Sequence, residues 1–86
     1  MSDSEENGIR TAEILGEVAR SFERPEVGVD DDFAQLGANS VALLRLMSAI
    51  QEKYDISIDL VDILQIENVA ELVKLVNESL AREKGR

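Results

Sequence analysis

The sequence predicts an all-α fold, a bundle of three longer helices with one short helix before the last. Apolar residues recur at helical spacing in three separate segments, and the one segment with strand-like alternation has no second strand to pair with. The chain has 86 residues, which suits one small domain. We expect this domain to cover residues 9–82, between a disordered acidic tail at 1–8 and a disordered tail at 83–86.

The first helix is expected to start at Thr11, which can cap it, and to end between residues 22 and 24. Its apolar residues follow one helical stripe: Ile14, Leu15, Val18 and Phe22. Pro25 ends it, because proline disfavours helical geometry in the residue before it.

Residues 25–39 are expected to form a long ordered loop, attached to the core by Phe33 and Leu36. Connections of this length are unusual in a compact domain and often carry function. The run of three aspartates at 30–32 suggests a calcium site, but it lacks the spacing and the terminal Glu of an EF-hand loop. We therefore favour solvated charge and turn capping, and expect no metal site.

The second helix is predicted from Ser40 or Val41 to about Lys53, with a buried stripe of Leu43, Leu46, Met47 and Ile50. Val41 and Leu44 follow Ser40 by one and four residues and share its face. Two interpretations remain open: the pair is exposed for docking, or the apolar stripe is wide enough to bury both.

The remaining elements are a buried loop containing Ile56 and Ile58, and a short helix from Asp59 or Leu60 to Gln65. We expect Asp59 to cap the short helix, and Ile63 and Leu64 to face inward. The last helix follows a capping box at 68–71, in which Asn68 is the cap and Glu71 the third helical residue. Its apolar stripe is Val69, Leu72, Val73, Val76 and Leu80.

The composition excludes several functions. The chain has no Cys and no His, so it lacks a thiol nucleophile, a disulfide and the usual general base near neutral pH. We therefore expect it not to be an enzyme. Its net charge of −9 opposes binding to nucleic acid or to anionic membranes. It has no transmembrane segment or signal peptide pattern, and we expect a cytoplasmic protein.

The junction at residues 37–41 is the most informative segment. Gly37 permits a positive φ angle, Asn39 or Ser40 can cap the following helix, and Ser40 is expected near the surface. The simpler interpretation of Ser40 is a helix N-cap. The alternative is that its hydroxyl is a site of modification.

This segment resembles the signature of the carrier protein family, the acyl carrier proteins and the peptidyl carrier domains of nonribosomal synthetases. The resemblance covers roughly residues 11–81 and is most specific in the run Asp31-Asp32-Phe33-Ala34-Gln35-Leu36-Gly37-Ala38-Asn39-Ser40-Val41-Ala42-Leu43. The run Ile66-Glu67-Asn68-Val69-Ala70-Glu71-Leu72 is similar to the start of the last helix in peptidyl carriers.

The resemblance implies that a phosphopantetheinyl transferase attaches 4'-phosphopantetheine to the Ser40 hydroxyl, with Gly37 and Asn39 shaping the site. The thiol of the arm would tether acyl or aminoacyl intermediates as thioesters. A loading enzyme and downstream synthase or modifying enzymes would then act on this cargo. We expect a monomer whose contacts with these partners involve Val41, Leu44, Arg45 and Ser48.

Two departures from the family bear on function. The residue before the serine is commonly Asp in acyl carriers and Asp or His in peptidyl carriers, whereas here it is Asn39, which lacks the charge. Arg45 makes the second helix less acidic than in fatty-acid-type carriers. With the peptidyl-like last helix, Arg45 favours a carrier of secondary metabolism, of the polyketide or nonribosomal peptide type.

An acidic helical adaptor without a prosthetic group is the main alternative, and Asn39 motivates it. An acidic mimic of nucleic acid has only the net charge to support it. The short tails suggest a free-standing protein, although a domain cut from a synthase would look similar, and both interpretations remain open.

Overall fold

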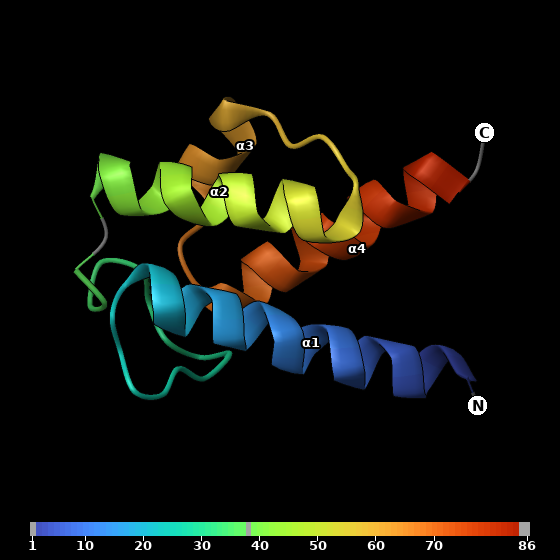
Figure 1. Ribbon diagram of the computed structural model, residues 1–86, viewed down its shortest axis with the longest axis horizontal. Coiled ribbons are helices and arrows are strands. Elements are labelled where there is room, and N and C mark those ends of the chain that lie inside the picture. Colours follow the sequence, from blue (N-terminus) through green and yellow to red (C-terminus); the bar gives the residue numbers. More distant parts are fainter. Residues whose placement is uncertain (1, 38, 85–86) are drawn as a thin grey trace.

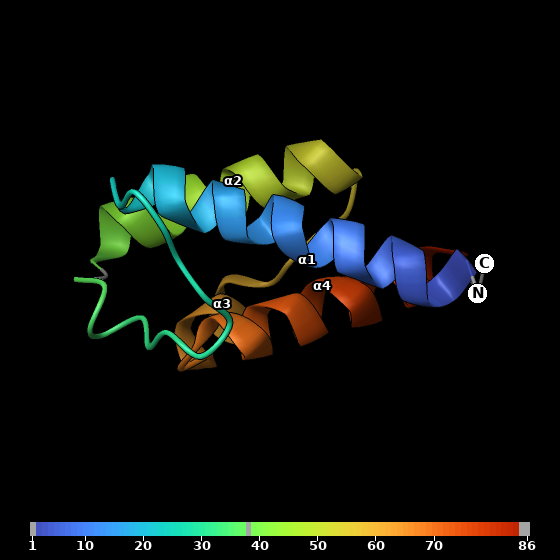
Figure 2. The ribbon, with the colours of Figure 1, turned by 90° about the horizontal axis from the view of Figure 1, so that it is seen from below.

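The computed structural model describes residues 2–37 and 39–84, and it confirms the all-α prediction. Four helices are described: α1 (Ser2–Ser21), α2 (Ser40–Tyr54), α3 (Leu60–Gln65) and α4 (Val69–Lys84). α1 runs antiparallel to α2, and the start of α1 and the end of α4 lie at the end of the bundle opposite the start of α2 (Figure 1). Figure 2 shows the same bundle from below, with α1 next to both α2 and α4.

The core is aliphatic and comes from every helix. Ile14 and Val18 of α1 are fully buried, as are Leu46 and Ile50 of α2. The other buried apolar residues with larger side chains are Val27, Phe33, Leu36, Ile56, Ile58, Ile63, Val69, Leu72 and Val76. Most residues of the predicted stripes therefore face the core, with Leu15, Phe22, Met47, Val73 and Leu80 packed around it. Leu43 was predicted to be buried but is only half-buried and lies outside this core, whereas Ala42 is buried.

The start of α1 differs from the prediction. We expected Thr11 to cap the helix and residues 1–8 to form a tail, but α1 begins at Ser2 and includes Thr11. Once a helix is nucleated by a packed segment, each added residue forms one more backbone hydrogen bond at little further cost. No proline precedes Pro25, so no residue of the strongest helix-breaking type stops this extension, and Gly8 disfavours it by only about 1 kcal/mol.

The C-terminal boundary also shifts. A tail was expected at 83–86, but α4 continues to Lys84, so residues 83 and 84 are helical. The rest of that expected tail, residues 85 and 86, lies outside the described residues.

The long loop is ordered because it satisfies the first amides of α4, which have no partner within the helix. The Val69 and Ala70 amides donate to the carbonyls of Asp31 and Val29, at 3.1 and 3.0 Å. The Glu71 amide donates to Asn68 Oδ1 at 2.9 Å, which confirms Asn68 as a cap. The Phe33 amide donates to the Glu67 carbonyl at 2.9 Å, beside the antiparallel bridge between Asp32 and Asn68.

The helix α3 matches its predicted bounds but not all of its predicted contacts. Ile63 is buried, whereas Leu64 is 58% exposed, so the expectation that Leu64 faces inward is wrong. A helix of six residues makes fewer than two turns, and here a single residue of it is buried. Asp59 occupies the N-cap position, but its side chain forms no capping hydrogen bond.

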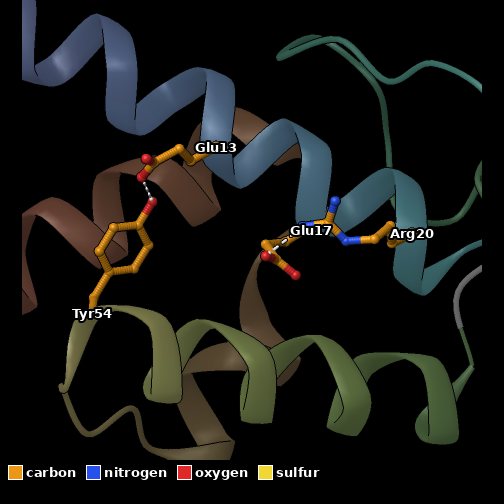
Figure 3. A network of polar contacts seen from close by, with 4 residues as sticks. All are labelled: Glu13, Glu17, Arg20 and Tyr54. Carbon is orange, nitrogen blue, oxygen red and sulfur yellow. Dashed lines mark hydrogen bonds and ion pairs between the residues drawn. The ribbon is translucent and has the colours of Figure 1, made fainter.

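A polar contact joins α1 to the end of α2 (Figure 3). The Tyr54 hydroxyl donates to Glu13 Oε1 at 2.8 Å, while Glu17 and Arg20 pair on the same helix at 2.5 Å. Burial, together with the hydrogen bond and the negative charge of Glu13, raises the pKa of Tyr54 well above its ordinary value.

No helix within residues 2–37 and 39–84 has the length and apolar character required to span a bilayer.

Candidate functional site

The chain enters the site through a turn that ends at Gly37. The Leu36 amide donates to the Asp32 carbonyl at 3.0 Å, and the Gly37 amide donates to the Ala34 carbonyl at 3.2 Å. Gly37 has a φ of +80°, a conformation that side chains disfavour. The predicted role of this glycine in shaping the turn is therefore consistent with its backbone geometry.

Asn39 caps α2. Its backbone is extended, and its Oδ1 accepts a hydrogen bond of 2.9 Å from the Ala42 amide. Its carbonyl accepts the Leu43 amide at 2.9 Å, which starts the helical pattern of hydrogen bonds. Of the two predicted capping residues, Asn39 and not Ser40 therefore performs this role.

Ser40 is the first residue of α2, and it is exposed. Its hydroxyl forms no hydrogen bond to any of the residues that the structure describes. The helix presents free backbone amides at this end, and no acidic side chain occupies its first turn. The site thus combines an accessible hydroxyl with a helix terminus that favours a negatively charged group.

The two open interpretations of Val41 and Leu44 can now be distinguished. Val41 is 61% exposed and Leu44 is 46% exposed, so the apolar stripe of α2 does not bury them. Arg45 and Ser48 are exposed as well. All four residues predicted to contact partners are therefore accessible on α2. The exposed aliphatic residues of α3, Leu60, Val61 and Leu64, were not predicted to be accessible.

A cavity of about 330 Å³ lies between the end of α1 and the start of α2. Both chain neighbours of Ser40, Asn39 and Val41, line it. The sequence analysis missed the residues that line it from α1 and just beyond, which are Ser21, Phe22 and Glu23. One signal was present, because Ser21 follows Ile14 by seven residues and is a polar residue on the buried stripe.

The aspartates of the loop cap turns, as expected. Asp31 Oδ2 accepts the Gly28 amide at 2.8 Å, and Asp32 Oδ1 accepts the Ala34 amide at 3.4 Å. Within the part of the chain that the structure describes, no three acidic residues group as metal ligands would.

This arrangement defines a class of protein: a small helical bundle that presents an exposed serine hydroxyl at a loop-to-helix junction. Residues 12–76 match the family model described as the phosphopantetheine attachment site. The chain belongs to this family and is a carrier protein, whose prosthetic group is covalently attached 4'-phosphopantetheine.

Curated relatives are consistent with this assignment. The chain is 32% identical to phosphinothricin tripeptide synthetase PhsB of Streptomyces viridochromogenes, in an alignment of 79 residues that covers 92% of this chain. It is 33% identical over 76 residues to nonribosomal peptide synthetase 32 of Fusarium pseudograminearum, covering 88% of this chain. The chain spans 7% and 1% of the lengths of these two relatives.

Solved structures support the fold. BlmI, a type-II acyl carrier protein from Streptomyces verticillus involved in bleomycin biosynthesis, aligns with a TM-score of 0.84 at 24% identity, over 92% of this chain and 95% of BlmI. The acetyl actinorhodin acyl carrier protein from Streptomyces coelicolor aligns with a TM-score of 0.71 at 22% identity, over 85% and 92% of the two chains. At these identities the likeness concerns the fold alone.

The residues present fit the prosthetic group. Attachment as a phosphodiester needs an accessible hydroxyl, and the Ser40 hydroxyl is exposed and makes no competing hydrogen bond within the described residues. The amide end of α2 suits the negative charge of the phosphate.

Proposed function

We propose that Ser40 is the residue to which 4'-phosphopantetheine is attached. The observation that carries this proposal is the division of roles at the start of α2, where Asn39 caps the helix and the exposed Ser40 hydroxyl forms no hydrogen bond to the described residues. A transferase can reach this hydroxyl without breaking the cap. When bound, the arm supplies a terminal thiol that holds acyl or aminoacyl groups as thioesters.

The protein contributes position and recognition to this function. The turn at Gly37 directs the chain into α2, and the packed stripe of Leu46 and Ile50 holds α2 on the core. Ser40, as the first residue of α2, is thereby fixed where that helix begins, at one end of the bundle (Figure 1). The exposed positive end of the helix dipole stabilises a phosphate on that hydroxyl, by about 0.3–1 kcal/mol.

Partner enzymes perform the chemistry on the cargo, and the carrier itself is not catalytic. The chain has neither Cys nor His, so it lacks a thiol nucleophile and the usual general base near neutral pH. Val41 and Leu44 offer apolar contact to these partners, while Arg45 and Ser48 offer polar contact. The partners are the phosphopantetheinyl transferase, a loading enzyme and downstream synthase or modifying enzymes. The working form is a cytoplasmic monomer.

The pathway we propose is the biosynthesis of a secondary metabolite of the nonribosomal peptide or polyketide type. Both curated relatives described above are named as peptide synthetases, and BlmI is named for bleomycin biosynthesis. The exposed Arg45 supports the same proposal, because it makes α2 less acidic than in fatty-acid-type carriers.

The test of attachment is the intact mass after incubation with coenzyme A and a broad-specificity transferase. We expect a mass gain of one phosphopantetheine on the unmodified sequence and on Ser57→Ala, which removes another exposed serine. Ser40→Ala should show no gain. A gain that persists in Ser40→Ala would place the attachment on another residue.

The second candidate function is an adaptor that docks on a partner and carries no prosthetic group. The exposed aliphatic residues of α2 and α3 favour this candidate, because they offer a docking surface whether or not Ser40 is modified. In this case Ser40→Ala would leave function intact, while Leu44→Asp would abolish it. Loss of function in both variants, with modification blocked only in Ser40→Ala, excludes the adaptor.

A further inference from the structure

We propose that the cavity between α1 and α2 is a docking site for the part of the phosphopantetheine arm nearest Ser40. This inference rests on the proposed attachment at Ser40 and adds where the arm lies on the protein. The docked arm would contact residues at the end of α1, about twenty positions before Ser40 in the sequence.

The first argument is position. Asn39 and Val41, which flank Ser40, both line the cavity. Ser40 itself is not among the described lining residues, so an arm attached to it starts at the edge of the cavity and not inside it. A tethered ligand reaches a nearby site at an effective concentration of about millimolar, so weak contacts are enough to hold it. The volume of about 330 Å³ lies within the usual range for small-molecule pockets, roughly 300–1,000 Å³.

The second argument is the state of Ser21. This residue is only 9% exposed, and its side chain has no hydrogen-bond partner among the described residues. Every fully buried polar side-chain atom of those residues has a hydrogen-bond partner. The Ser21 hydroxyl has none among them, so it is not fully buried. It opens to the cavity that Ser21 lines. A hydroxyl in this position can donate to, and accept from, the amide and hydroxyl groups of the pantetheine chain.

The third argument is charge. Arg45 is the one cation among the described residues that line the cavity, and no ion pair or hydrogen bond commits it to another described residue. Side chains on a helix lean towards its N-terminus, so Arg45 leans towards the end that carries Ser40. It can form a charge-assisted hydrogen bond with the phosphate. Glu23 also lines the cavity. Its negative charge repels the phosphate, so the phosphate is favoured on the side of the cavity where Arg45 lies.

The apolar lining matches the remaining chemistry of the arm. Phe22 and Leu36 provide apolar surface, which suits the methyl groups of the pantoyl segment. Val41 and Arg45 line this cavity and also belong to the partner face, the four α2 residues proposed to contact partners: Val41, Leu44, Arg45 and Ser48. A partner that binds these two residues would therefore compete with the docked arm and release its thiol for reaction.

The experiment compares backbone amide NMR spectra of the full chain before and after loading from coenzyme A, with the loading verified by intact mass. We expect shifts at Ser21, Phe22 and Glu23 in addition to those beside Ser40. Ser21→Ala and Arg45→Gln, each loaded to completion, should reduce the α1 shifts. The matched controls Ser79→Ala, a buried serine on α4, and Lys53→Gln, a cation in the last turn of α2, should keep them.

The outcomes separate this inference from the proposed attachment. No mass gain on the unmodified sequence would overturn both. Complete loading with shifts confined to the surroundings of Ser40, or with distant shifts on α3 instead of α1, would overturn the docking site alone. Shifts at α1 that arise only after the thiol is acylated would show that the cavity takes cargo, which also contradicts docking of the arm.

Discussion

The side chain of Asn39 accepts a hydrogen bond of 2.9 Å from the backbone amide of Ala42, so the residue before Ser40 fixes the start of α2. Because Asn39 caps the helix, the hydroxyl of Ser40 is not needed for capping and can take the proposed phosphopantetheine group. It also explains how an amide can replace the acid common at this position in the family, because either side chain has an oxygen that can accept the amide proton.

The first prediction concerns this cap. Asn39→Ala should lower the free energy of unfolding by about 1 kcal/mol, because it removes the hydrogen bond to the Ala42 amide. Asn39→Asp is the matched control and should be as stable as the original or more so, since its charge favours the helix N-terminus. Urea unfolding followed by circular dichroism measures both. Equal stability of the Ala and Asp variants would contradict the capping role.

The second prediction concerns the turn before Ser40. Gly37→Ala should lower the free energy of unfolding by about 1–2 kcal/mol, because Gly37 has a φ of +80° and an added Cβ disfavours this conformation. No atom lies within 4 Å of the position of that Cβ, so the cost is conformational and not a steric clash. Gly28→Ala is the control, since Gly28 has equal space and no positive φ. Thermal unfolding should show a lower midpoint for Gly37→Ala only.

The third prediction is a pH dependence at Tyr54. The hydroxyl donates to Glu13, and the folded pKa is raised above the ordinary value of 10.0. A raised pKa means that the folded state holds the proton more tightly, so this contribution to stability is complete below pH 10 and is lost as the pH rises above it. Unfolding by urea at a series of alkaline pH values should show a fall in stability that Tyr54→Phe reduces.

The same contact can be tested by direct titration, because Tyr54 is the single tyrosine of the chain. The absorbance of the tyrosinate should appear at a higher pH in the folded protein than in the protein unfolded by urea. Glu13→Gln should lower the folded pKa, because it removes a nearby negative charge. Identical titrations of the folded and unfolded states would contradict the assigned contact.

The spacing of apolar residues in the sequence was enough to predict the helices that bury one apolar face. Ile14 and Val18, or Leu46 and Ile50, lie four residues apart and are buried on one helix face, which is a local and periodic signal. The beginning of α1 at Ser2 could not be predicted in this way, because the residues before Ile9 have no apolar period. A helix that extends beyond its packed stripe leaves no such signal.

The candidate site was predictable in part for the same reason. Gly37, Asn39 and Ser40 act through turn and cap geometry, which depends on residues adjacent in sequence. The cavity depends on tertiary structure, because the ordered loop brings the end of α1 to the start of α2. Ser21 was detectable as a polar residue on an apolar stripe, but its nearness to Ser40 was not.

The last prediction tests the partner face of α2. Val41 is 61% exposed beside Ser40, so Val41→Asp should leave the fold intact while introducing a charge into any apolar contact with a partner. We expect the catalytic efficiency of the transferase on this variant to fall about tenfold or more, which corresponds to about 1.4 kcal/mol of lost interaction. Steady-state rates with coenzyme A in excess measure this effect.

Ile9→Asp is the matched control for that variant. Ile9 is 62% exposed, almost the same as Val41, but it lies in the N-terminal half of α1, which is the half farther from the start of α2. Its substitution adds the same charge and should leave the transferase rate unchanged within about twofold, because surface changes outside an interface cost little. Equal losses in the two variants would indicate a general effect of charge, and the face around Val41 would then not be the surface that the transferase recognises.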